Sequence, residues 1–249
     1  MKQANKIIFP KIEEVVLAFE KLDSLPDLRS YFKDLIIKIG LTEFQLSEVT
    51  DTEDFPGDNL SIGTLPDSYI RKYWRNGNYM FHDPVVRKAF TSNQPVRYSE
   101  YLVRTDNSKR VQEIYDFRKK QGIIDGYGFP LKGRLNRFAV INIIGDMSRF
   151  SKAEIIKLEM YGILLYRRAA ELFPLKESLG FVESGVLTDR ERECLTWVAK
   201  GKTNWDISQI LMITERTVQY HVENAREKLG VDTRLQAVVV AARRLEIVL

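Results

Sequence analysis

The sequence predicts an α+β domain followed by an all-α domain, and three observations support this division. Helical and strand-like segments are mixed up to about residue 173, which is typical of helices packed on a largely antiparallel sheet. From residue 187 onward, every segment with a clear period is helical. Between them, residues 174–186 contain Pro, Ser and two Gly without a clear period. We therefore expect domains at 1–173 and 187–249, joined by a linker at 174–186.

The first domain shows both kinds of periodicity. Apolar residues recur at helical spacing and predict helices over 12–22, 28–39, 67–75, 84–90, 108–120 and 151–173. The last of these helices begins at the capping box Ser151-Lys-Ala-Glu154. Strands are expected over 44–49, 59–62, 126–131 and 137–144, with turns or loops at 54–58, 76–78 and 132–136.

The second domain reads as four helices. Capping boxes at Thr188-Asp-Arg-Glu191 and Thr233-Arg-Leu-Gln236 open the first and the last, which is expected to run through Leu245. Thr203 or Asn204 caps the second helix, and Thr214 caps the third. The third carries one apolar stripe, made of Val218, Val222, Ala225 and Leu229. Two capped helices joined by a very short turn form a helix-turn-helix, which can place a helix in the DNA major groove.

Composition excludes several classes of protein. The 249 residues are 44% hydrophobic and 29% charged, with no apolar run of the ~20 residues that a membrane span needs. No signal peptide is recognisable, so we expect a cytoplasmic protein. One cysteine, Cys194, and two distant histidines, His82 and His221, give no basis for a disulfide framework, a metal site or a cofactor. An enzyme built on His82 and Asp83 would lack a nucleophile–base pair and a phosphate loop, so no catalytic residue is expected.

The net charge of +4 gives no argument for nucleic acid. Residues 181–249 hold ten Lys and Arg against ten Asp and Glu, so the excess lies entirely in the first domain. DNA binding must therefore be argued from where the charges lie on the helices.

The polar face of the third helix in the second domain has side chains that can read bases. Gln219 can bind adenine bidentately, Glu223 can accept from cytosine, and Tyr220 can reach a phosphate or a thymine methyl. Residues expected to contact the DNA backbone are Lys202, Thr203, Arg216, Thr217 and Lys228. Periodicity alone favours the solvated face of a small helical bundle, and the tight turn between two capped helices shifts the balance toward DNA reading.

Several motifs in this domain resemble the LuxR-type helix-turn-helix. They are Leu187-Thr-x-Arg-Glu-x-Glu-Cys-Leu195, Ala199-x-Gly-Lys202, Asp206-Ile-Ser208, Glu215-Arg-Thr-Val-x-x-His221, Lys228-Leu-Gly-Val231 and Gln236-Ala237. The resemblance covers the whole domain without a gap. It implies that the third helix reads the major groove and that the last helix, 236–245, forms a dimer contact.

The first domain resembles the acyl-homoserine-lactone-binding domain of quorum-sensing LuxR-type regulators. The resemblance rests on Leu65-Pro-x-x-Tyr69-x-x-x-Tyr73, Tyr79-x-x-x-Asp83-Pro-Val-Val86 and Gln94-Pro-x-x-Tyr98, followed by Gly122 and Gly126. It implies an α-β-α sandwich around an antiparallel sheet. The family usually has Trp where this chain has Tyr69 and Tyr98. A register without an insertion near residues 77–78 would instead place Ile70 and Trp74 at two of the pocket positions.

The resemblance places the ligand at Tyr69, Tyr73, Asp83, Tyr98 and Asn142. A lactone amide offers one N–H, which Asp83 can accept, and two carbonyls, to which Tyr69, Tyr73 and Asn142 can donate. Other interpretations remain open. Asp83 before Pro84 is also a typical helix N-cap, and aromatic residues spaced by four are often simply core. The run Arg118-Lys119-Lys120 is interpreted as a solvated helix end.

These observations predict a cytoplasmic homodimer that regulates transcription in quorum sensing in response to an acyl-homoserine lactone. Its expected partners are the small-molecule signal and a near-palindromic double-stranded operator, with RNA polymerase as a further candidate and no membrane. The alternative is an orphan regulator that answers a non-lactone molecule or binds DNA without a ligand. The sequence leaves open the acyl group, the operator, and whether the ligand promotes or releases DNA binding.

Overall fold

The structure is a computed structural model that describes residues 8–49, 60–73, 79–101, 108–134, 138–173 and 185–248. Two compact units form, Met1–Gly133 with Phe138–Leu175, and Lys176–Leu249 with Arg134–Arg137. The turns predicted at 54–58 and 76–78, and most of the linker predicted at 174–186, lie outside the described residues. Within the described part of the chain, no helix is long and apolar enough to cross a membrane.

A five-stranded antiparallel sheet forms the centre of the first unit, with strand order β2-β1-β5-β4-β3. The strands are β1 Glu43–Val49, β2 Ser61–Gly63, β3 Val96–Arg97, β4 Gly126–Lys132 and β5 Phe138–Ile144. The sequence predicts four of them to within a few residues. It misses β3, because two residues are too few to show an alternation.

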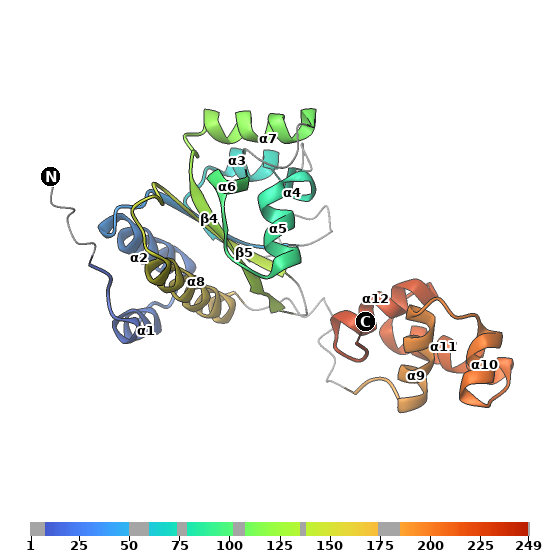
Figure 1. The fold of residues 1–249 in the computed structure, drawn as a ribbon. Coiled ribbons are helices and arrows are strands. Elements are labelled where there is room, and N and C mark those ends of the chain that lie inside the picture. The colour runs from blue at the N-terminus through green and yellow to red at the C-terminus, as the bar shows by residue number, and fades with distance from the viewer. Residues whose placement is uncertain are drawn as a thin grey trace, which may run out of the picture. The chain divides into compact units, whose positions relative to one another are not determined.

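Helices cover both faces of this sheet (Figure 1). One face packs against α1 Ile12–Glu20, α2 Leu25–Lys38 and α8 Lys152–Leu172. The other faces α3 Asp67–Arg71, α4 Tyr79–His82, α5 Pro84–Ser92, α6 Tyr98–Tyr101 and α7 Lys109–Lys120. This arrangement confirms the predicted α-β-α sandwich. The four-residue helices α4 and α6 are absent from the prediction because they are shorter than two helical turns.

The strands divide their side chains between two hydrophobic cores. Phe44, Leu46, Ile141 and Ile143 are fully buried toward α1, α2 and α8. The alternate positions, which include Ile144, point to the helices on the opposite face. The second core is rich in tyrosine, and it holds Tyr69, Tyr73 and Tyr98, three of the residues that the sequence selects for ligand binding.

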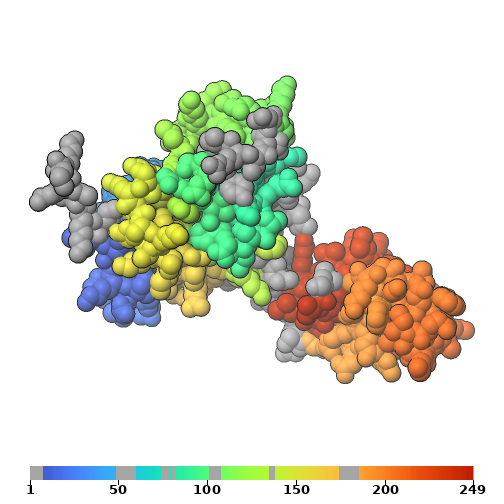
Figure 2. Space-filling view, in the orientation of Figure 1, coloured from blue at the N-terminus to red at the C-terminus, as the bar shows by residue number. Residues whose placement is uncertain are grey.

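The second unit contains the four expected helices, α9 Asp189–Ala199, α10 Asn204–Leu211, α11 Glu215–Leu229 and α12 Arg234–Arg243. The space-filling view shows them as one continuous body (Figure 2). The predicted capping boxes at Thr188 and Thr233 both form. The helix α12 ends at Arg243 rather than Leu245, because Leu245 adopts a left-handed conformation with φ of 58°. The stripe on α11, from Val218 to Leu229, is buried as predicted.

Candidate ligand pocket and DNA-reading face

A small cavity lies between the sheet and the helices α3 to α7, with a volume of about 30 Å³. Four of the five predicted ligand-binding residues line it, namely Tyr69, Tyr73, Tyr98 and Asn142. The other lining residues are Gln45, Ser47, Leu65, Ile70, Val86, Arg118, Ile123, Val140 and Ile144. The structure therefore brings together side chains that are up to 99 positions apart in the chain.

The strands provide a polar floor for this cavity. Gly128, Asn142, Gln45 and Gly63 are paired side by side across β4, β5, β1 and β2. The Cβ position of Gly128 lies 3.4 Å from the Asn142 Oδ1, so the Asn142 amide is next to Gly128 on the floor. The Tyr98 hydroxyl donates to that Oδ1 at 2.6 Å. An amide and a phenol are thus already connected at one end of the cavity.

Asp83 is completely buried and is one contact removed from the cavity. Its Oδ1 accepts from the backbone N–H of Val85 at 2.9 Å, so the N-cap interpretation is confirmed. Its Oδ2 accepts from the Tyr73 hydroxyl at 2.5 Å and forms an ion pair of 2.6 Å with Arg118 Nη2. The carboxylate is therefore engaged by a helix end, a phenol and a guanidinium at once.

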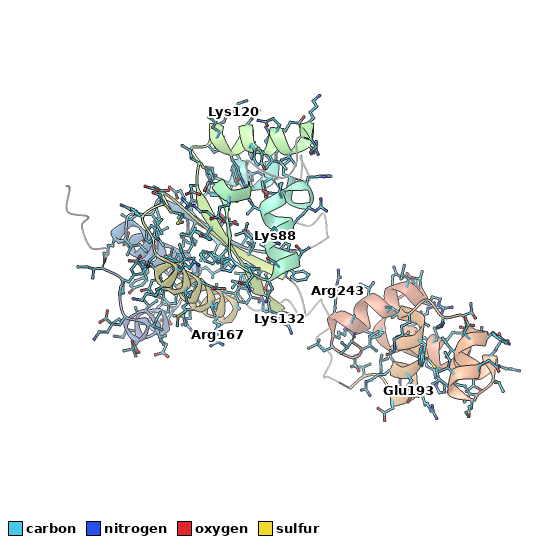
Figure 3. All side chains as sticks on the ribbon, viewed as in Figure 1. Lys88, Lys120, Lys132, Arg167, Glu193 and Arg243 are labelled. Atoms are coloured by element: carbon cyan, nitrogen blue, oxygen red, sulfur yellow. The ribbon has the colours of Figure 1, made fainter. Side chains whose placement is uncertain are left out.

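Arg118 corrects the sequence interpretation. Its neighbours Lys119 and Lys120 are exposed, and Lys120 points outward from the end of α7 (Figure 3). Arg118 instead is only 4% exposed and lines the cavity. It falls on the same stripe of α7 as Val111 and Ile114, which are both buried. That placement is the signal in the sequence that marks Arg118 as an inward residue.

The guanidinium of Arg118 remains a cation in this setting. Burial acts to lower its pKa, but the Asp83 carboxylate and the surrounding tyrosines hold the pKa well above its ordinary value. Its central carbon lies 4.5 Å from the centre of the Tyr98 ring, a cation–π contact. Two of its nitrogens, Nε and Nη1, have no hydrogen-bond partner within the described residues.

Two of the pocket tyrosines form a stack with Phe117. The ring of Tyr69 lies between Tyr73, at 5.9 Å, and Phe117, at 4.9 Å, with nearly parallel planes. Burial raises the pKa of Tyr69, Tyr73 and Tyr98, so their phenols stay protonated and act as donors. Two of the three hydroxyls already donate within the protein, from Tyr73 to Asp83 and from Tyr98 to Asn142.

A second, more open cavity of about 540 Å³ adjoins the first. Gln45, Leu65 and Ile70 line both cavities and so stand between them. The second is lined further by Leu25, Pro26, Arg29 and most of residues 61–67. The two spaces therefore share three wall residues.

The second unit presents an exposed face on α11, opposite its buried stripe. Gln219, Tyr220, Glu223 and Arg216 are exposed there, and the ring of Tyr220 is 60% exposed. The Gln219 Nε2 donates to the Glu223 Oε1 at 2.8 Å. Two of the three predicted base-reading side chains thus bind each other.

The residues predicted to contact the DNA backbone are placed differently from one another. Lys202 is exposed just before α10, and the Thr203 hydroxyl donates to the Asp206 carboxylate at 2.7 Å as part of a capping box. The Thr217 hydroxyl lies 2.8 Å from that of Thr214 at the start of α11. Lys228 forms an ion pair with Glu191, because its Nζ donates to both carboxylate oxygens of that residue at 2.9 and 2.8 Å.

Comparison with known families identifies the chain. Residues 24–171 match the autoinducer binding domain, and residues 185–241 match the bacterial regulatory proteins of the luxR family. The protein therefore belongs to the LuxR family of autoinducer-binding transcriptional regulators, a family of transcription factors rather than enzymes.

Individual relatives agree with this assignment. The transcriptional activator BjaR1 of Bradyrhizobium diazoefficiens is 33% identical over 72% of each chain. The quorum sensing-dependent regulator RpaR of Rhodopseudomonas palustris is 30% identical over 92% of this chain and 91% of its own. The crystal structure of Escherichia coli SdiA shares the fold, with a TM-score of 0.58 at 18% identity over 94% of this chain and 96% of the other.

Proposed function

We propose that the autoinducer is an N-acyl-homoserine lactone whose head group occupies the cavity at Tyr69, Tyr73, Tyr98 and Asn142. The observation that carries this proposal is the meeting of these four side chains, with Asp83 directly behind them, in one buried cavity. A few polar groups inside an apolar wall fix the orientation of a small ligand. Neutral phenols and an amide suit a ligand made of carbonyls and one N–H.

Ligand binding must enlarge the pocket. A cavity of about 30 Å³ has room for no more than about two water molecules. The adjoining space of about 540 Å³ lies within the range of small-molecule sites. We place the acyl chain there, past Leu65 and Ile70, with the ring on the tyrosine side. The lactone would then bind an opened arrangement more tightly than the closed one, which is the condition for a ligand-driven switch.

The proposed working form is a homodimer. On α8, Ile156, Met160 and Ile163 are exposed at positions i, i+4 and i+7, so they form one apolar stripe. On α12, Leu235 and Val239 are exposed at i and i+4. Two copies would hold two α11 helices ~34 Å apart over a near-palindromic site. Pairing would raise the affinity of a domain whose charges are balanced and which would bind DNA weakly alone.

We propose that α11 reads bases through Gln219, Tyr220 and Glu223, while Lys202, Thr203, Arg216 and Thr217 contact phosphates. Arg216 and the three base-reading side chains are exposed on the face of α11 opposite its buried stripe, which supports this assignment. Lys228 is left out, since its ammonium already neutralises the buried Glu191 carboxylate.

Binding of a lactone panel to the full-length protein tests the ligand proposal. At a concentration of 100 times the Kd, a bound lactone should stabilise the folded protein by about 2.7 kcal/mol, measured as a rise in the unfolding midpoint. The rise should depend on acyl length. The proposal fails if no lactone shifts the midpoint of a protein that is folded and binds DNA.

A regulator of a non-lactone molecule is the second candidate. One observation favours it, namely that the Asp83 carboxylate is occupied by Arg118 and Tyr73. Mass spectrometry of the small molecules that co-purify with the protein would reveal such a ligand.

A further inference from the structure

The buried guanidinium of Arg118 has hydrogen-bonding capacity that the protein does not use. Its Nη2 is paired with Asp83, while Nε and Nη1 find no partner within the described residues. A buried N–H without an acceptor costs about 1–3 kcal/mol, more when the group is charged. Because the side chain lines the cavity, a molecule in the cavity is the natural source of the missing acceptor.

The tyrosines are less able to serve a ligand carbonyl than their number indicates. A phenol has a single O–H. The hydroxyl of Tyr73 is given to Asp83, and that of Tyr98 to Asn142. A ligand that took either bond would leave Asp83 or Asn142 with one donor fewer. Arg118 can donate from Nε and Nη1, which have no hydrogen-bond partner within the described residues.

Charge balance restricts the acceptor. Asp83 and Arg118 neutralise each other, and both are buried. A carboxylate on the ligand would leave the site with a net buried negative charge, which is costly in a low-dielectric interior. A carbonyl oxygen satisfies the free N–H groups and keeps the site neutral.

We propose that Arg118 binds the head-group carbonyl of the signal and selects an uncharged carbonyl head group over a carboxylate. The inference rests on the proposed lactone function, in which the ring carbonyl is the acceptor. It assigns the selection of the head group to α7, to the first residue of the basic run that the sequence analysis interprets as a solvated helix end. Tyr69, Tyr73 and Tyr98 would then serve mainly as the aromatic walls of the site.

Three ligands with one acyl chain test the proposal: the intact lactone, the same amide on a tetrahydrofuran ring without the carbonyl, and the ring-opened homoserine carboxylate. Full-length wild-type protein should bind the intact lactone about 10- to 100-fold more tightly than the carbonyl-free amide, as expected for a hydrogen bond to a charged donor. The carboxylate should also bind more weakly than the lactone.

The same ligands are then titrated into variants. The double substitution Asp83→Asn with Arg118→Met removes the free N–H groups without leaving a buried charge, and circular dichroism checks that it folds. Its preference for the carbonyl should fall to about threefold or less. Lys119→Gln, which removes an exposed charge from the same helix, should keep the full preference.

The outcomes separate the two proposals. If wild type binds the lactone but the double variant keeps its full carbonyl preference, the role of Arg118 is overturned and the lactone function stands. Tighter binding of the ring-opened carboxylate by wild type overturns the selection for an uncharged head group. If none of the lactones binds folded wild type, both proposals fall together.

Discussion

The ion pair between Asp83 and Arg118 should be a main support of the sensing domain, and Asp83→Ala should show it. The change would leave a guanidinium that is 4% exposed without its carboxylate, with a 3.5 Å contact from its Nη2 to the Tyr73 hydroxyl and a cation–π contact with Tyr98 remaining. Breaking a buried pair from one side costs about 3–5 kcal/mol. The Val85 N–H also loses its cap, typically worth about 1 kcal/mol. Against a domain stability of about 5–15 kcal/mol, this loss is large.

Replacing both partners should cost less than replacing one. In the double variant Asp83→Asn with Arg118→Met no charge remains buried, so we expect a coupling of about 2 kcal/mol or more between the two sites. The assay is a urea series on the full chain, followed by pulsed hydrogen exchange of the peptides from β4 and β5, which report on this domain alone. The single variants Asp83→Asn and Arg118→Met supply the other two mutant corners of the cycle.

Two results would refute this reasoning. Asp83→Ala could cost less than about 1 kcal/mol, or the costs of the two single changes could simply add in the double variant. Either outcome would mean that the pair is not coupled in solution. The prediction also affects how ligand experiments are read, since Asp83→Ala could lose its response through unfolding. The neutral double variant avoids that ambiguity.

Three further predictions concern the other surfaces. Gln219→Ala should relax base preference at one operator position by about 1–3 kcal/mol in anisotropy titrations, while the exposed control Glu227→Gln should not. Equal weakening of DNA binding on all sequences would contradict a base-reading role for Gln219. Burial raises the pKa of the Glu191 carboxyl, but the hydrogen bonds from Lys228 and Thr188 lower this pKa more, to below the ordinary 4.5. The ionised carboxylate therefore stabilises the fold above about pH 4.5, and this stabilisation is lost as the pH falls through the lowered pKa. The variant Glu191→Gln should therefore lose less free energy of unfolding than wild type between pH 7 and pH 3.5. Urea unfolding monitored by the fluorescence of Trp197 and Trp205 measures this loss, and equal losses in the two proteins would contradict the prediction. Met160→Glu should convert the dimer to a monomer in sedimentation velocity. The control Ile124→Glu changes a residue that is 72% exposed and lies outside the apolar stripe of α8, so it should leave the dimer intact. A Met160→Glu variant that is still a dimer would exclude α8 from the interface.

The DNA-binding half could be predicted almost completely from the sequence. Its helices are short, amphipathic and opened by side-chain caps, so local signals such as Thr188 with Glu191 define each start. The end of α12 is the exception, since the left-handed conformation of Leu245 reflects tertiary structure and not the local preference of leucine. The commitment of Lys228 to Glu191 is likewise a contact across 37 residues, which periodicity on one helix cannot reveal.

The sensing half was predicted as a fold but only partly as a site. The pattern identified Tyr69, Tyr73, Tyr98 and Asn142, which do meet at one cavity. It could not show that the hydroxyls of Tyr73 and Tyr98 already donate hydrogen bonds within the protein. Nor could it show that Asp83 is both the N-cap of α5 and the counter-ion of Arg118. The prediction of a solvated Arg118 is wrong because the residue belongs to the buried stripe of α7, although its neighbours Lys119 and Lys120 are charged and exposed.

The central claim is that a small molecule in the tyrosine-lined cavity controls DNA binding by α11. Its most direct test is a gel-shift titration of the full-length protein on a panel of palindromic sites, with and without the lactone that stabilises it most. We predict that the lactone changes the apparent Kd for the preferred site at least tenfold in wild type, and that the double variant at Asp83 and Arg118 binds the site but loses that change. An unchanged Kd in wild type with the lactone demonstrably bound would contradict the claim.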